Sequence, residues 1–393
     1  MEDRIASICL EKYAMLKKTG KPTENEWTVL SGVVLQNIYE DLSVVALCTG
    51  TKCLSGKELN SPNIIDRGDR LSDSHAEVLA RRAFLRFLYD QIELLLKSGD
   101  SDVFYMEDKK IRLKDISFHF FSSQTPCGDC SIIPKLQLRT DRKRPKLDNE
   151  PIQESDFGAI ITDIYRTGAK CLVNDERQDS QQKGADYHIT GPIRTKPGRG
   201  DRTQSLSCSD KIARWNVLGA QGALLSLMIP SIRFESITIG GGCPYSSESM
   251  NRGIYMRFDP KIQGPVIKQS KISFDCKKSH SRTRPCPTSI VWCAVLEKEV
   301  EIAVNGFRQG MTKKKIKSRR LAISRKEIFK TFLKVSHLYS ELRNESLSNH
   351  PKKIYYHDCK QYALSYQNTW RDYLTTFRNW PLKNRDLYEC LSF

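Results

Sequence analysis

The stretch D-S-H-A-E-V-L-A-R-R-A-F-L, residues 73–85, decides the fold, because polar residues give way there to apolar residues at helical spacing. The same spacing continues downstream and predicts one long helix, Ala76–Leu96, that buries one face. Segments rich in Val, Leu and Phe and bounded by turn formers predict strands on both sides of it: Trp27–Leu35, Leu42–Cys48 and Ile116–Phe121. Strands that alternate with helices predict an α/β architecture with one mixed sheet.

The rest of the chain continues this alternation after one long interruption. From about 138 to 205 the pattern dissolves into Pro, Gly, Asp, Arg and Lys, which predicts a basic surface insertion with one apolar piece at Phe157–Tyr165. Beyond it we expect, in order, a helix at Ser209–Leu227, a strand at Glu235–Gly240, a hairpin at Ser289–Val304 and C-terminal helices at Arg325–Arg343 and His357–Phe377. We therefore predict a single domain over residues 1–393, elaborated by the insertion and the C-terminal helices.

The composition is that of a soluble and basic protein. Of the 393 residues, 39% are hydrophobic and 28% are charged, a balance that excludes a disordered chain. Lys and Arg number 63 against 46 Asp and Glu, and the resulting charge of +17 favours a polyanionic partner, with nucleic acid the leading candidate. The longest apolar runs, such as Ser43–Cys48, fall far short of the ~18 residues that a membrane helix needs, so we expect no membrane association.

Charge at the N-terminus and the cysteine usage indicate the compartment. Acidic and basic residues interrupt the apolar ones between residues 1 and 18, so no secretory signal core forms there. We therefore expect an intracellular protein, in the nucleus or cytoplasm or both, whose 13 cysteines stay reduced. Closely spaced cysteines in such a protein suggest metal binding before disulfide formation.

Two short motifs carry the chemistry. His75-Ala76-Glu77 opens the predicted long helix, and T-P-C-G-D-C, residues 125–130, follows a predicted strand. Together they match the H-x-E and P-C-x-x-C signature of zinc nucleobase deaminases. An imidazole and thiolates at helix starts can meet around one tetrahedral zinc and leave the fourth position to water. Both halves in this order and setting favour that interpretation over a surface H-A-E beside an unrelated cysteine pair.

Glu77 lies two residues after His75, close to the metal without having to be a ligand. Zinc lowers the pKa of a bound water from about 15.7 to about 7, which makes hydroxide available at neutral pH. Glu77 would take the proton of that water and deliver it to the ring nitrogen and the departing ammonia of the base. The residues thus predict hydrolytic deamination.

The third zinc ligand remains open on spacing alone, since Cys130 and Cys208 both lie at the start of a predicted element. A site that used both cysteines with His75 and Cys127 would be closed, and the chain would then be an RNA-binding protein with a structural zinc. A cytidine deaminase, which uses the same metal chemistry, is a third possibility.

Several blocks of sequence resemble the deaminase domain shared by adenosine deaminases acting on RNA and their tRNA-specific relatives. The resemblance covers residues 32–380 and is carried by T-G-T-K-C at 49–53, H-A-E-x-x-x-R-R at 75–82, P-C-G-D at 126–129 and S-C-S-D-K-I-A-R-W-N at 207–216. It implies a cytidine-deaminase-like three-layer fold with a mixed central sheet. It also implies zinc ligands His75, Cys127 and Cys208, from which the additional Cys130 is a departure, and places Thr51 and Lys52 beside the flipped nucleotide.

Three further blocks are similar to the tRNA-specific members of the family: residues 165–171, 196–203 and 243–246. They imply conversion of adenosine to inosine in tRNA, at the adenosine immediately 3′ of the anticodon of alanine tRNA; a deaminase acting on another RNA is the alternative. The chain has no spare length for double-stranded-RNA-binding domains. The anticodon stem-loop is the expected partner, because an unpaired loop releases a base from the stack at least cost. Nothing in the sequence indicates an oligomeric state.

Four cations lie behind the predicted metal site: Arg81, Arg82, Lys211 and Arg214. Their burial would be costly unless a polyanion shared the space. The resemblance implies that this polyanion is inositol hexakisphosphate. It adds the following contacts: Arg325, Tyr356, Lys360, Trp380 and Lys383.

The resemblance also assigns Asp73 as a relay that links Lys211 to Lys52, and it places Trp370 where a lysine is expected. The alternative is that these basic residues contact tRNA phosphates on the surface.

Overall fold

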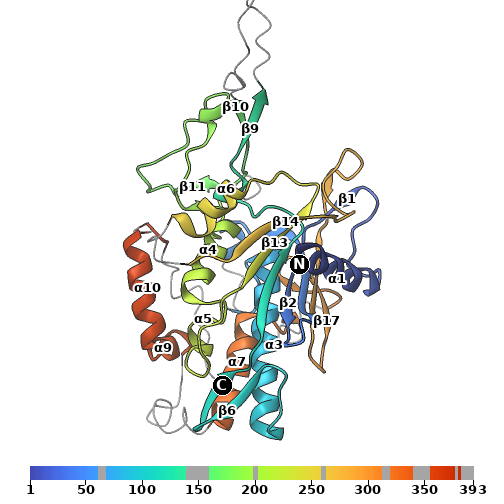
Figure 1. Cartoon of the computed structure of the whole chain (residues 1–393), viewed down its shortest axis with the longest axis vertical. Coiled ribbons are helices and arrows are strands. Elements are labelled where there is room, and N and C mark those ends of the chain that lie inside the picture. The colour runs from blue at the N-terminus through green and yellow to red at the C-terminus, as the bar shows by residue number, and fades with distance from the viewer. Residues whose placement is uncertain are drawn as a thin grey trace, which may run out of the picture.

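A mixed sheet of eight strands forms the centre of the fold (Figure 1). The computed structural model describes residues 1–60, 68–138, 159–197, 202–257, 263–311, 319–339, 355–376 and 379–381. The strands of the sheet, in spatial order, are β14 (Val266–Ser273), β13 (Ser236–Gly241), β8 (Ser117–Ser122), β2 (Leu30–Gln36), β3 (Leu42–Thr49), β16 (Thr288–Cys293), β17 (Val300–Val304) and β18 (Phe307–Arg308). Strands β8, β13 and β14 run parallel and the other neighbours antiparallel, which confirms the predicted α/β class and mixed sheet.

Helices cover both faces of this sheet and complete three layers. Helix α1 (Glu2–Met15) packs on one face, and α3 (Ala76–Ser98) packs on the other, with α7 (Arg325–Leu338) behind it. Six of the seven residues of β2 are buried, because both faces of the central strands are covered. The α3 face meets the sheet through aromatic rings, with Phe84 and Phe118 4.8 Å apart between centroids. Among the described helices, none combines the length and apolar character needed to cross a membrane.

Shorter helices continue the α3 side of the molecule: α4 (Cys208–Leu218), α5 (Gly222–Leu225), α9 (Tyr356–Gln361) and α10 (Leu364–Thr376). The predicted helix Ser209–Leu227 is broken at Gly219, whose φ of +86° ends α4. The predicted helix His357–Phe377 is likewise divided into α9 and α10. Apolar residues continue at helical spacing across both breaks, so the spacing did not predict them; the backbone conformation of the structure shows where each helix ends.

The remaining elements are small and lie around the sheet ends. They are β1 (Glu26–Trp27), β4 (Thr51–Cys53), α2 (Gly56–Asn60), β5 (Asp73–His75), β6 (Phe104–Glu107), β7 (Lys110–Leu113), η1 (Asp129–Ser131), β11 (Lys170–Cys171), η3 (Ala185–Tyr187), β12 (Arg194–Thr195), α6 (Ser247–Asn251), η4 (Arg252–Met256) and β15 (Arg284–Pro285).

The predicted insertion has two different halves. Its first half is an antiparallel arm, β9 (Ile133–Leu138) paired with β10 (Ala159–Tyr165), that projects from the body (Figure 1). In the second half, residues 176–183 lie mostly on the surface, whereas Arg194 and Lys196 further along are fully buried. The side chain of Arg194 pairs with Asp179 at 2.6 Å, so the charges that suggested solvent exposure serve buried ion pairs instead.

We predict that Phe84→Ala lowers the free energy of unfolding by about 3–5 kcal/mol, because it removes a ring that packs on Phe118 and Phe234. The exposed Tyr39 is the control, and Tyr39→Ala should change stability by less than about 0.5 kcal/mol. Urea unfolding monitored by fluorescence measures both. Equal effects of the two substitutions would contradict the packing described here.

Candidate active site

Three potential metal ligands from distant parts of the chain meet at one point. The Sγ of Cys208 lies 3.6 Å from Nδ1 of His75, and the Sγ of Cys127 lies 4.0 Å from the same nitrogen. All three ligand atoms lie within 4.8 Å of one another. Tetrahedral zinc with bonds of about 2.0–2.3 Å holds its ligand atoms about 3.5–3.8 Å apart, so the donor set and its spacing fit this metal.

The two helix starts hold two of these ligands. His75 ends β5 and is the N-cap of α3, and Cys208 is the first residue of α4. Strand β4 pairs with β5 so that Thr51 lies opposite His75 and Lys52 opposite Ser74. The hairpin therefore brings the predicted substrate-binding pair next to a metal ligand.

A tight turn presents Cys127 to α4. Gly128 has a φ of +104°, and a Cβ there would lie 2.3 Å from Oγ of Ser207, so glycine is required. Ser209 fastens the turn: its Oγ donates to the carbonyl of Cys127 at 2.9 Å and accepts from the amide of Cys130 at 3.1 Å. The amide of Cys208 in turn donates to Sγ of Cys127 at 3.4 Å.

Cys130 does not join the cluster. Its Sγ points to the carbonyl of Met250 at 3.9 Å, and burial raises the pKa of its thiol to about 12. In the part of the chain that the structure describes, His75, Cys127 and Cys208 form the one group of three or more possible metal ligands. Three protein ligands leave a fourth position for water, as a catalytic zinc site requires.

Two buried oxygen atoms at this site are unsatisfied among the described residues. Glu77 is 3% exposed and its Oε2 has no hydrogen-bond partner; the same holds for Oγ1 of Thr51. Such atoms are costly to bury, and each unpaired one needs an explanation such as a missing water, ion or ligand. A carboxylate and a hydroxyl are thus free to bind water or substrate beside the ligand cluster.

Asp73 connects the ligand cluster to two lysines. Its Oδ2 accepts from Nζ of Lys196 at 2.7 Å and from Nζ of Lys211, while Oδ1 accepts from the amide of His75 at 3.0 Å. Burial would raise the pKa of Asp73, but the charges of Lys196 and Lys211 outweigh it and hold that pKa well below its usual value. Asp73 thus contacts Lys211, as the relay between Lys211 and Lys52 requires, and Lys196 is a further lysine bound to it. The link of Asp73 to Lys52 stays a prediction.

Lys196 is the residue that the sequence analysis did not assign. It is 1% exposed, and although burial opposes its charge, Asp73 and the thiols of Cys208 and Cys127 raise its pKa well above the usual value. Its Pro- and Gly-rich surroundings suggested a surface loop. The one sequence signal for Lys196 is that it opens the block at 196–203, which is similar to the tRNA-specific members of the family.

Without a metal, the surroundings favour the thiolate form of Cys127 and the thiol form of Cys208. The hydrogen bond with Cys208 lowers the pKa of Cys127 well below its usual value, and Lys196 and His75 act in the same direction. Burial, followed by the effect of Cys127, raises the pKa of Cys208. A bound cation would favour the thiolate at both positions.

Cations and aromatic rings gather around α4 and α5. Nε of Arg81 donates to the carbonyl of Ala220 at 2.7 Å, and its guanidinium lies 5.9 Å from the ring centre of Trp215. Burial lowers the pKa of Arg81, and the nearby charge of Arg214 also lowers it. Across the described residues, neither Arg81 nor Arg214 has a carboxylate partner, so two half-buried cations here lack a counter-charge.

Aromatic rings hold the other cations of this group. The guanidinium of Arg214 lies 4.1 Å from the ring centre of Trp370 and 5.6 Å from that of Trp380. The ring of Tyr356 lies 5.4 Å from Arg325 and 5.5 Å from Lys360.

We call this set the basic–aromatic cluster: Arg81, Arg82, Lys211, Arg214, Arg325, Tyr356, Lys360, Trp370 and Trp380. Within it, Nε of Arg82 donates to the carbonyl of Ile323 at 2.7 Å. The predicted contact Lys383 lies outside the described residues.

Comparison with known proteins gives one consistent family. The adenosine-deaminase (editase) domain matches residues 46–384. The tRNA-specific adenosine deaminase 1 of Drosophila melanogaster is 39% identical over 98% of this chain and 95% of its own length, and that of Homo sapiens is 33% identical over 94% and 95%. The double-stranded RNA-specific adenosine deaminase of Mus musculus is 28% identical over 85% of this chain and 28% of its own length.

We predict that Cys208→Ala abolishes stable zinc binding and that Cys130→Ala does not, because only the first thiol faces His75. Both residues are buried cysteines, which makes them matched controls for each other. Elemental analysis after dialysis should find about one zinc per chain in the wild type and in Cys130→Ala. Loss of zinc in Cys130→Ala with retention in Cys208→Ala would show that the ligand assignment is reversed.

Proposed function

The chain belongs to the adenosine-deaminase (editase) family and is a hydrolytic deaminase that converts adenosine to inosine in tRNA, and we propose that its target is the adenosine immediately 3′ of the anticodon of alanine tRNA. One observation carries the chemical part of this proposal. Glu77, a buried carboxylate whose Oε2 has no hydrogen-bond partner among the described residues, lies two residues from a ligand of a three-membered metal cluster. That arrangement suits a proton shuttle beside an activated water.

His75, Cys127 and Cys208 are the residues that hold zinc in this proposal. When bound there, zinc supplies hydroxide at neutral pH by lowering the pKa of water from about 15.7 to about 7. Glu77 takes the first proton of the attacking water and delivers it to the ring nitrogen, where it stays. It then transfers the second proton, from the newly added hydroxyl, to the amino group, which leaves as ammonia. The carbonyl oxygen of inosine comes from the water, so atoms and charge balance.

Thr51 and Lys52 position the nucleotide. Thr51 lies opposite His75 in the β4–β5 hairpin, and its unsatisfied Oγ1 is available to a sugar hydroxyl. Lys52 is the next residue on the same strand and contributes a positive charge for the adjoining phosphate. The substrate base has to leave its stack to reach this site, which costs least in the unpaired anticodon loop of the stem-loop.

Two alternative functions, a structural zinc site and deamination of cytidine, are argued against by different observations. A closed structural zinc site would need Cys130, whose thiol points to Met250 instead of the cluster. Deamination of cytidine uses the same metal chemistry, so family membership, and not the zinc ligands, argues for adenosine. We place the reaction inside the cell, in the nucleus or the cytoplasm, where tRNA is found.

The basic–aromatic cluster is the proposed site of inositol hexakisphosphate. Arg81 and Arg214 are half-buried cations without carboxylate partners among the described residues, and a polyanion would supply the missing counter-charge. Lys211 belongs to this cluster and also binds Asp73, which contacts the backbone of His75. The polyanion would thus act as a structural cofactor that stabilises the cations behind the metal site.

We predict that Glu77→Gln lowers the rate of inosine formation by about 10²- to 10⁴-fold, because an amide cannot carry the proton. Zinc content and tRNA affinity should stay close to those of the wild type. The assay sequences reverse-transcribed tRNA after incubation, where inosine is read as G and a uridine product as T. Glu93→Gln is the control and should keep full activity, because Glu93 lies on the same helix at a half-buried position where it pairs with Lys97 and Lys334 instead of facing the metal ligands. Full activity of Glu77→Gln would remove this residue from the mechanism.

A separate prediction concerns the polyanion. Protein purified in high salt and freed of nucleic acid should release about six phosphates per chain on acid digestion. The double substitution Arg81→Ala and Arg214→Ala should lose them, whereas Arg86→Ala, on the same helix but bound to carbonyls of residues 297 and 298, should retain them. If the wild-type protein contains no phosphate, the proposed cofactor site is wrong, and the cluster would instead contact RNA phosphates.

A further inference from the structure

Two arginines on one widened helical turn contact both cysteine-bearing segments. Helix α6 continues into η4, a π-helical turn, and Arg252 and Arg257 lie at its start and directly after its end. On a regular α-helix, residues five apart point about 140° away from each other. A π-turn reduces this angle, and such turns are rare and frequent at functional sites. Here it lets both side chains reach toward the ligand segments.

Arg252 holds the segment that carries Cys127. Its Nε donates to Oδ1 of Asp129 at 2.8 Å, and its terminal nitrogen donates to the carbonyls of Asp129 and Ile132 at 3.0 and 2.9 Å. The side chain of Asp129 is completely buried and lies two residues after Cys127. One guanidinium thus fixes the whole turn between the metal ligand and β9.

Arg257 does the same for the segment that carries Cys208. It donates to Oδ1 of Asp210 at 2.9 Å and to the carbonyl of Gly253 at 2.6 Å. The other oxygen of Asp210 accepts from Oγ of Ser207 at 2.6 Å and from the amide of Arg194 at 3.0 Å. Asp210 therefore connects Arg257 to the N-cap of α4, immediately before the ligand.

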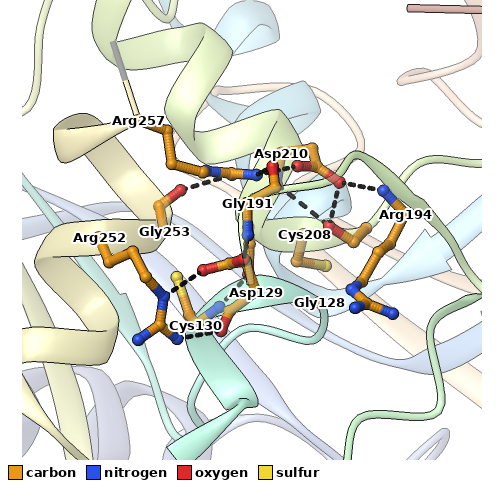
Figure 2. A network of polar contacts seen from close by, with 12 residues as sticks. Gly128, Asp129, Cys130, Gly191, Arg194, Cys208, Asp210, Arg252, Gly253 and Arg257 are labelled. Carbon is orange, nitrogen blue, oxygen red and sulfur yellow. Dashed lines mark hydrogen bonds and ion pairs between the residues drawn. The ribbon is translucent and has the colours of Figure 1, made fainter. Parts of the chain in front are cut away.

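Gly191 joins the two ion pairs into one frame (Figure 2). Its amide donates to Oδ2 of Asp129 at 2.6 Å, and its carbonyl accepts from Arg257 at 3.3 Å. The arginines of this frame contact Asp129 and Asp210, which lie two residues after Cys127 and Cys208, and not the ligand atoms themselves. A guanidinium that makes several charge-assisted hydrogen bonds has a well-defined position and orientation. Such a group can therefore set the distance between the two segments that it joins.

We propose that Arg252 and Arg257 are positioning residues that set the distance between the thiols of Cys127 and Cys208, and thereby the affinity and ligand geometry of the metal site. The inference rests on the proposed zinc site but is independent of which RNA is the substrate. It assigns these two ion pairs a role in metal binding, as positioning contacts for the two cysteine-bearing segments.

The test compares Arg252→Lys and Arg257→Lys with Arg320→Lys. Lysine keeps the charge but cannot make the multiple contacts of a guanidinium. Arg320 is the matched control, because it also forms a buried pair with an aspartate, Asp69, and its side-chain contacts among the described residues are with Asp69 and Glu327 instead of the cysteine segments. Zinc affinity is measured by competition with a chelator, and cobalt-substituted protein reports ligand geometry through its thiolate and ligand-field absorption bands.

We expect zinc affinity to fall by about 10-fold in each of the first two variants, with shifted cobalt bands. Arg320→Lys should lower the melting temperature by a similar amount and leave both metal readouts unchanged. If a lysine variant does not fold, Asp129→Asn and Asp210→Asn replace it, since they keep the shape and an oxygen acceptor.

Metal affinity and cobalt spectra that match the wild type in all folded variants of the frame would overturn the inference. Equal losses in Arg320→Lys would overturn it as well, because they would reflect general instability. Wild-type protein that binds no zinc would instead overturn the proposed function, and this inference with it.

Discussion

Burial of charge is the constraint on which the site depends. Two thiols, the carboxylates of Asp73 and Glu77 and the ammonium of Lys196 occupy a space largely closed to water. Ions in such surroundings are tolerated only when opposite charges or hydrogen bonds compensate them. Asp73 compensates two lysines and also binds the amide of His75, so one carboxylate organises both the charge balance and a metal ligand. Oε2 of Glu77 has no such compensation from the residues that the structure describes, which suits the proton acceptor that we propose it to be.

The same constraint divides the basic residues of the chain into two kinds. Lys196, Arg252 and Arg257 have carboxylate partners, and they hold the active-site segments together without any ligand. Arg81 and Arg214 instead lie against tryptophan rings, which stabilise a cation by about 0.5–2 kcal/mol but do not neutralise it. Lys196, Arg252 and Arg257 thus have their charges balanced within the protein. Arg81 and Arg214 leave a positive cluster that suits an anionic cofactor.

Sequence patterns predicted the elements that depend on local periodicity. The spacing of apolar residues predicted α3 and most central strands to within a few residues, because a helix or strand with one buried face repeats at a fixed interval. The break at Gly219 has a local cause, since a glycine with positive φ ends the helix, but apolar spacing does not record it. The burial of Arg194 and Lys196 depends on long-range partners, so no local pattern could reveal it. Spacing alone also left Cys130 and Cys208 equivalent. The two thiols differ only in the folded chain, where one faces His75 and the other faces Met250.

The central claim is that two thiols and one imidazole meet at one metal and leave a position open. X-ray absorption at the zinc edge of the purified protein tests it most directly, since the method counts sulfur and lighter neighbours of the metal. The account predicts two sulfur atoms at about 2.3 Å and two nitrogen or oxygen atoms at about 2.0–2.1 Å. Three sulfur neighbours would mean that Cys130 or another thiol closes the site, and would contradict the catalytic role.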